Sequence, residues 1–164
     1  MNPQWSDQWW PVAFLKDLDR RQPSRFTLLE RDLVLWWDRA ESCWRAFPDV
    51  CPHRLVPLSE GRINAEGLLE CPYHGWSFSG DGQCRRIPQA SESSRPEGRR
   101  SSCSSLPTAT AQGLLFVWTG DPAAADPALL PLVPLLREEG EGWADGWIVQ
   151  DTFRDLPMDA LTLL

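Results

Sequence analysis

Histidine is scarce in this sequence, and two further shortages exclude whole classes of function. The 164 residues contain only two histidines, so a site with several imidazole ligands must use both. Basic residues are outnumbered by acidic ones, and the net charge of −7 argues against nucleic acid as a partner. The longest apolar run, residues 128–136, contains two prolines and is too short to span a bilayer.

Signals for secretion are also missing. Residues 1–15 have neither the basic lead nor the apolar centre of a signal peptide, so we expect a protein that is not secreted. Five cysteines are an odd number for a disulfide framework. We interpret Cys43, Cys84 and Cys103 as free thiols in a reducing compartment, although the sequence leaves a Cys84–Cys103 bridge open.

Two short clusters of metal-ligand residues stand out against this background. Cys51-Pro52-His53 is followed, after seventeen residues, by Cys71-Pro72-Tyr73-His74. Each cluster therefore offers one thiol and one imidazole. Two Cys and two His suit either a tetrahedral zinc ion or a [2Fe–2S] cluster in which two His replace two Cys on one iron.

The order of the ligands favours the diiron centre. Zinc fingers usually separate a Cys pair from a His pair along the chain, whereas here each loop contributes one of each. We expect Cys51 and Cys71 to hold one iron as thiolates, and His53 and His74 to hold the other as neutral imidazoles. A structural zinc site remains the alternative.

The sequence around these ligands resembles that of a known family, the Rieske non-haem iron oxygenases. It is similar to the branch that includes pheophorbide a oxygenase, chlorophyllide a oxygenase and chloroplast-envelope Rieske proteins, with cyanobacterial relatives. The resemblance is carried by Gln8–Asp19, Arg31–Asp38, Cys51–Arg62, Cys71–Phe78, Gly80–Gly82 and Ile87–Gln89. It implies a [2Fe–2S] cofactor and a protein in the cytoplasm or associated with a plastid or thylakoid.

The resemblance also implies a reaction. In this family an electron passes from a ferredoxin or reductase through the [2Fe–2S] cluster to a mononuclear iron, which oxygenates the substrate. The branch implies a large hydrophobic ring as substrate, such as a chlorophyll derivative, and often a homotrimer. Both histidines are already assigned, so mononuclear Fe(II) is expected only in a longer protein, and no catalytic residue is assigned here.

We accordingly expect the N-terminal part of an oxygenase, cut before its mononuclear iron motif. Residues 1–120 are predicted to form the Rieske domain, and residues 121–164 a Pro/Ala-rich connector with the start of a catalytic domain. The alternative function is a free-standing Rieske ferredoxin-type electron carrier. The continuation from 121 to 164, with Trp143, Trp147 and Phe153, favours the oxygenase.

The predicted fold is mainly β, an antiparallel Rieske β-sandwich with two cluster-binding loops. Strands are expected from Trp10 to Phe14, in a hairpin 26–37 with a charged tip at 30–32, at 43–47, at 85–88 and, buried on both faces, at 113–118. A strand pair at 143–153 and a helix from Asp159 should follow.

Four expectations concern the surroundings of the ligands. Leu55, Val56 and Leu58 are expected to shield the site from water, and backbone N–H groups at 54–56 and 75–77 to donate to its sulfurs. Arg54 is either part of a loop salt bridge or a positive charge beside the centre. The arginines of the Ser/Arg-rich stretch 90–105 are interpreted as a solvated loop, with a donor-docking patch as the alternative.

Overall fold

A computed structural model of the chain describes residues 7–90, 101–134, 152, 154 and 157. Its strands form three antiparallel sheets, ordered β1-β10-β9, β2-β3-β4 and β5-β6-β7-β8. The strands are β1 (Trp9–Phe14), β2 (Ser24–Leu28), β3 (Arg31–Asp38), β4 (Cys43–Pro48), β5 (Arg62–Ile63), β6 (Leu69–Glu70), β7 (Ser77–Phe78), β8 (Cys84–Arg86), β9 (Thr108–Ala111) and β10 (Leu114–Trp118). The short 3-10 helices are η2 (Leu15–Asp17), η4 (Pro122–Ala124) and η5 (Pro127–Leu129). The predicted mainly β, antiparallel fold is confirmed.

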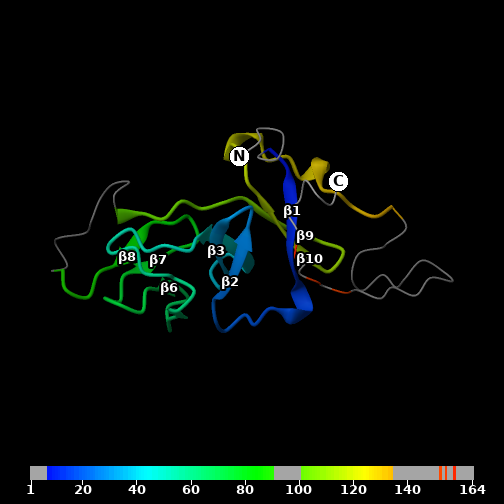
Figure 1. Cartoon of the computed structure of the whole chain (residues 1–164). Helices are drawn as coiled ribbons and strands as arrows, with labels where there is room; N and C mark the ends of the chain where they lie inside the picture. The colour runs from blue at the N-terminus through cyan, green and yellow to red at the C-terminus, as the bar shows by residue number, and fades with distance from the viewer. Residues whose placement is uncertain (1–6, 91–100, 135–151, 153, 155–156, 158–164) are drawn as a thin grey trace.

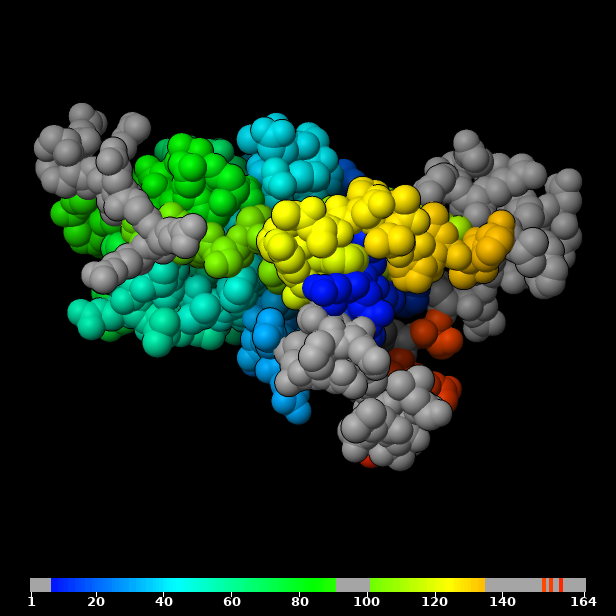
Figure 2. All heavy atoms as spheres, turned by 90° about the horizontal axis from the view of Figure 1, so that it is seen from above, coloured from blue at the N-terminus to red at the C-terminus, as the bar shows by residue number. Residues whose placement is uncertain are grey.

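The sheets follow one another along the molecule (Figure 1). The first two share a core, to which β1, β2, β3, β4 and β10 all contribute buried side chains, so they form the predicted sandwich. The third sheet carries the second ligand loop and lies at the opposite end from β1 and β9 (Figure 1). In the view from above, the cyan and green residues of this end are separated from the blue N-terminal strand by the yellow-green segment (Figure 2).

Strand β3 links the two halves because its side chains alternate between two cores. Leu33 and Leu35 face the core shared by the first two sheets, whereas Val34 and Trp36 face a second core beneath the ligand loops. All four are at most 3% exposed. The ligand loops therefore rest on a fixed strand in the middle of the molecule.

The hairpin of β2 and β3 differs from the prediction in its turn. Leu29 and Glu30 form the tip, with φ angles of 49° and 63°. Arg31 and Asp32, predicted to lie in the tip, are instead the first residues of β3 and pair with Leu28 and Thr27. Two consecutive residues with positive φ are typical of a two-residue turn whose twist matches that of the flanking strands.

Strand β10 confirms the prediction made from its continuous apolar run. It lies at the centre of its sheet, between β1 and β9. Leu115 and Val117 enter the core shared with the second sheet, and Phe116 and Trp118 pack on the opposite face. Both faces of this strand are thus covered.

Residues 121–134 lie back against the first sheet. The indole N–H of Trp9 donates to the carbonyl of Asp126 at 2.8 Å, and that of Trp118 donates to Asp121 at 2.9 Å. The predicted strand pair 143–153 lies almost wholly outside the described residues, and the helix predicted from Asp159 lies wholly outside them. The division of the chain at residue 120 stays a prediction. Within the described part, no helix is long and apolar enough to cross a membrane.

Candidate metal centre

Each predicted ligand cluster lies in a loop held between strands. The first loop follows β4 and precedes β5, and the second joins β6 to β7. Cys51 and Cys71 open the two loops, and each thiol belongs to the core beneath them. The predicted ligands therefore come from the two loops that the sequence indicated.

The two loops have the same backbone hydrogen bonds. The N–H of Cys51 donates to the carbonyl of Val56, and the N–H of Cys71 donates to that of Trp76, both at 2.8 Å. Since residue i pairs with residue i+5 in each case, the two loops close in the same way. The histidines differ in position, since His53 lies two residues and His74 three residues after its cysteine.

A second pair of hydrogen bonds extends the likeness. The N–H of Leu55 donates to the carbonyl of Cys51 at 2.8 Å, and the N–H of Gly75 donates to that of Cys71 at 3.1 Å. Both donors have left-handed backbone conformations, with φ of 59° at Leu55 and 72° at Gly75. Glycine adopts this conformation at no steric cost, whereas leucine adopts it only at a steric cost.

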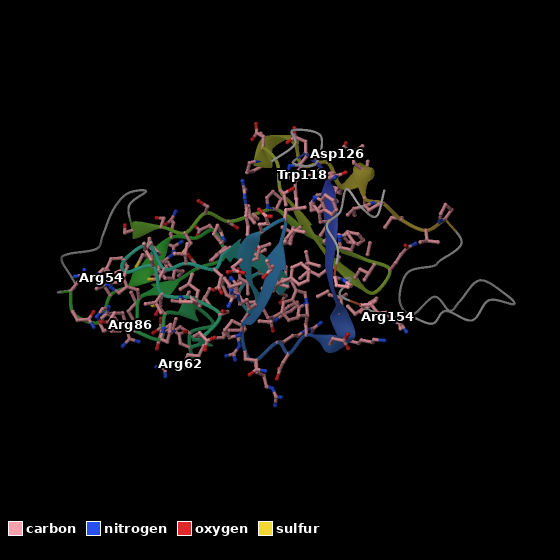
Figure 3. The ribbon with its side chains drawn as sticks, in the orientation of Figure 1. Arg54, Arg62, Arg86, Trp118, Asp126 and Arg154 are labelled. Atoms are coloured by element: carbon pink, nitrogen blue, oxygen red, sulfur yellow. The ribbon has the colours of Figure 1, made fainter. Side chains whose placement is uncertain are left out.

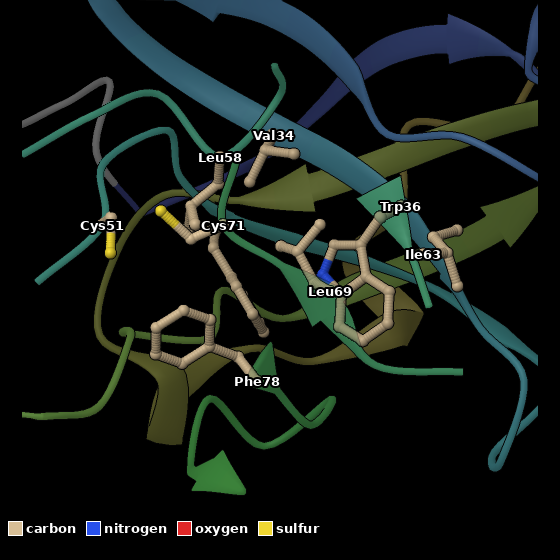
Figure 4. Close-up of a cluster of buried hydrophobic side chains, with 9 residues drawn as sticks. Val34, Trp36, Cys51, Leu58, Ile63, Leu69, Cys71 and Phe78 are labelled. Carbon is tan, nitrogen blue, oxygen red and sulfur yellow. The ribbon is translucent and has the colours of Figure 1, made fainter. Parts of the chain in front are cut away.

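The two thiols meet inside the protein. Cys51 is 1% exposed and Cys71 is 3% exposed, and their sulfurs lie at the same edge of the hydrophobic cluster (Figure 4). The pKa of Cys51 is raised to about 11, chiefly by burial and also by the neighbouring thiol of Cys71, while the backbone N–H groups of His53 and Arg54 act in the opposite direction.

The two imidazoles also meet. The ring centroids of His53 and His74 are 4.8 Å apart, with the rings inclined at 58°. Nδ1 of His74 is buried without a hydrogen-bond partner, which is costly unless that nitrogen binds something else. Desolvation, together with the charges of His74 and Arg54, lowers the pKa of His53, which favours the neutral, metal-binding form.

The four predicted ligands therefore form two pairs. Among the described residues, no three His, Cys, Asp or Glu side chains converge closely enough to hold one metal ion. A tetrahedral zinc site gathers four ligands around a single point. A diiron cluster with two Cys on one iron and two His on the other uses ligands in pairs, and these residues fit that group.

Two predictions about the surroundings have different outcomes. Leu58 is fully buried beside the thiols, as expected, but Leu55 is 73% exposed and does not shield the site.

Arg54 is exposed and has no ion pair within the described residues, while its charge contributes to lowering the pKa of His53. This supports the interpretation of Arg54 as a positive charge beside the centre. The arginines predicted as a possible docking patch at 95–100 lie outside the described residues.

Sequence reasoning missed the anchor of the first loop. The buried carboxylate of Asp49 accepts hydrogen bonds from the backbone N–H and the hydroxyl of Ser59, at 2.7 and 2.6 Å. These bonds join the two ends of the loop that contains Cys51 and His53. An acidic residue just before a ligand and a serine eight residues after it were the available signal.

The second loop has its own polar anchor. Glu70, 7% exposed and directly before Cys71, accepts hydrogen bonds from Arg62, from Asn64 at 3.4 Å and from Ser77 at 3.5 Å. A pocket of about 340 Å³ lies beside this group and is lined by Arg62, Glu70 and Cys71 among others. The carboxylate ties β5, β6 and β7 together at the base of the loop.

The remaining cysteines agree with the prediction of free thiols. None of the five is in a disulfide. Burial raises the pKa of Cys103, which packs with Cys84 against the core that contains Cys51 and Cys71.

Comparisons with known proteins identify the family. The family described as Rieske [2Fe-2S] domain matches residues 8–110. Pheophorbide a oxygenase, chloroplastic, from Arabidopsis thaliana is 55% identical over 120 residues, covering 70% of this chain and 22% of that protein. Protein TIC 55, chloroplastic, from the same organism is 34% identical over 162 residues, covering 98% of this chain and 28% of that protein.

Solved structures agree. The crystal structure of dicamba monooxygenase bound to dicamba superimposes with a TM-score of 0.69 at 36% identity, covering 77% of this chain and 38% of that one. The chain thus spans about a quarter of the length of these curated relatives and corresponds to their Rieske portion. The chain belongs to the Rieske [2Fe–2S] domain family, in the oxygenase branch that includes pheophorbide a oxygenase and TIC 55.

Proposed function

We propose that Cys51 and Cys71 bind one iron, and His53 and His74 the other iron, of a Rieske-type [2Fe–2S] cluster. When bound, such a cluster supplies a carrier for one electron. The proposal rests above all on the matched loops, whose equal backbone hydrogen bonds bring thiol beside thiol and imidazole beside imidazole. The backbone N–H groups of His53 and Arg54 lower the pKa of Cys51, which means that they favour negative charge on its sulfur.

The chain's larger role is that of the Rieske portion of an oxygenase. The relatives in its branch support this role, and pheophorbide a oxygenase suggests a large hydrophobic ring, such as a chlorophyll derivative, as the substrate. An oxygenase also needs a mononuclear Fe(II), commonly held by two His and a carboxylate. Because both histidines of these 164 residues serve the cluster, other residues of the complete enzyme supply that iron site.

The electron donor is a ferredoxin or a reductase that docks beside the histidines. Arg54 and Arg86 are exposed at the end of the molecule that carries the ligand loops (Figure 3). Leu55 and Tyr73 add exposed apolar surface at the loop tips, 73% and 62% exposed. A basic rim around an apolar centre, on a chain with net charge −7, suits an acidic donor.

The proposal extends to assembly and location. The complete enzyme forms a homotrimer, in which the cluster of one subunit serves the iron of the next. Its location is the cytoplasm or a plastid or thylakoid, and the chloroplastic relatives named above support the plastid. The five free cysteines suit such a reducing compartment.

Electron paramagnetic resonance (EPR) of the reduced chain, loaded with iron and sulfide, tests the ligand assignment. We expect the low-average-g signal of a His-ligated cluster, and we expect His53→Ala and His74→Ala to abolish it. Cys43→Ser, which changes a half-buried thiol outside both loops, is the matched control and should keep the signal. A colourless product with bound zinc would contradict the proposal.

A second experiment separates an oxygenase portion from a free-standing carrier. The loaded chain is supplied with reductant, oxygen and pheophorbide a, with and without the remaining length of a pheophorbide a oxygenase. We expect product only when the added polypeptide supplies a mononuclear iron site. Equal product formation by the chain alone would overturn this role.

A further inference from the structure

The indole of Trp76 lies flat against the imidazole of His53. The ring centroids are 4.5 Å apart and the planes differ by 6°. We propose that Trp76 is a positioning residue, which fixes the ring plane of His53 and covers one of its faces from water. The proposal rests on the assignment of His53 as a cluster ligand.

The stack joins the two ligand loops. His53 belongs to the first loop, whereas Trp76 closes the second loop by accepting the hydrogen bond from the N–H of Cys71 at 2.8 Å. Trp76 is half-buried and packs against the core that contains both thiols. Its indole is therefore anchored from below, and the anchored ring limits rotation of the imidazole above it.

His74 is held differently. Its ring lies next to that of Tyr73, with centroids 3.9 Å apart and an angle of 31°, and Tyr73 is 62% exposed. The side chain of Gln89 donates to the carbonyl of His74 at 3.1 Å, so this ligand is fixed through its backbone. Loss of the Trp76 indole should consequently disturb the imidazole of His53 and leave that of His74 in place.

The expected effect on the redox centre has a definite sign. The groups around a metal ligand set its orientation and the access of solvent, and both change the reduction potential. Removing the indole admits water to the face of His53, and water stabilises the more negatively charged, reduced state. The midpoint potential should therefore rise in Trp76→Leu, and rise less in Trp76→Phe because a smaller ring still covers the imidazole.

The test uses the 164-residue chain loaded with iron and sulfide and labelled with ¹⁵N-histidine. Pulsed EPR measures the couplings of the two histidine nitrogens, and redox titration at fixed pH measures the midpoint potential. We expect Trp76→Leu to change one coupling and raise the potential. The matched control is Tyr73→Leu, an aromatic-to-leucine change in the same loop, which should leave the His53 coupling unchanged.

Unchanged couplings and potential in Trp76→Leu would overturn the inference. So would an equal change of both couplings in both variants, since that pattern indicates general loosening of the loops. If Trp76→Leu does not take up iron, Trp76→Phe decides, and an unshifted potential in that variant overturns the inference. Absence of any histidine coupling in the unmodified chain would instead contradict the ligand assignment itself.

Discussion

Leu55 and Gly75 occupy equivalent positions in the two ligand loops. Each lies four residues after a ligand cysteine, donates its N–H to the carbonyl of that cysteine, and has a left-handed φ, of 59° and 72°. The first loop thus places a leucine where the second has a glycine. Leu55 already carries a side chain at this backbone position, whereas a substitution of Gly75 would introduce one.

Gly75→Ala should destabilise the chain by about 1–2 kcal/mol, because an L-residue at positive φ carries a cost of this size. The new Cβ would also lie 2.9 Å from Cγ of Pro88. The matched change Leu55→Ala should alter stability by less than about 0.5 kcal/mol, since that exposed position already carries a Cβ. Urea denaturation of both variants measures the difference, and equal losses would show that the left-handed backbone at Gly75 imposes no such cost on a side chain.

Asp49→Ala should cost about 1–3 kcal/mol, because it leaves the backbone N–H of Ser59 without its buried acceptor. The ends of the first loop would then separate, and the loaded chain should lose iron faster during gel filtration. Asp49→Asn retains one acceptor oxygen, so its stability and its iron retention should lie between those of the unmodified chain and Asp49→Ala. Iron retention equal to that of the unmodified chain in Asp49→Ala would argue against the anchoring role.

Glu70→Ala should also cost about 1–3 kcal/mol, since Asn64 and Ser77 lose their shared acceptor. The cost stays below that of breaking a fully buried ion pair, because the side chain of Arg62 is 74% exposed and remains hydrated. Chemical denaturation should place Glu70→Gln between the unmodified chain and Glu70→Ala. A greater loss in Glu70→Gln than in Glu70→Ala would mean that the carboxylate is not held by these donors.

The iron-free chain should lose stability as the pH rises from about 9 to about 11. Burial raises the pKa of the Cys51 thiol from 9.0 to about 11, so in this range the folded state retains a proton that the unfolded state releases. Stability contributed by the neutral thiol is therefore complete below pH 9 and declines above it. Thermal melts of Cys51→Ser should show a smaller decline, and an identical pH profile in that variant would contradict the assignment.

Some of this architecture is readable from the sequence. The uninterrupted apolar run in β10 indicates burial on both faces because alternate residues of a strand point to opposite sides. The spacing of Cys51, His53, Cys71 and His74 indicates two like loops, and the structure brings these residues together in pairs.

Other features depend on tertiary structure. Leu55 is predicted to cover the site, but it has a left-handed backbone and its side chain is exposed. Strand β5 has two residues, too few to show a periodic pattern, and it exists through its pairing with β6. The stacking of Trp76 on His53 joins residues of different loops, and no local sequence pattern predicts such a contact.

Mössbauer spectroscopy of the chain loaded with ⁵⁷Fe tests the central claim most directly. After one-electron reduction, the account predicts two unlike iron sites in equal amounts, a ferric site with cysteine ligands and a ferrous site with histidine ligands. His74→Cys should make the two sites more alike and lower the midpoint potential. A single iron site, or two alike sites with only sulfur ligands in the unmodified chain, would contradict the account.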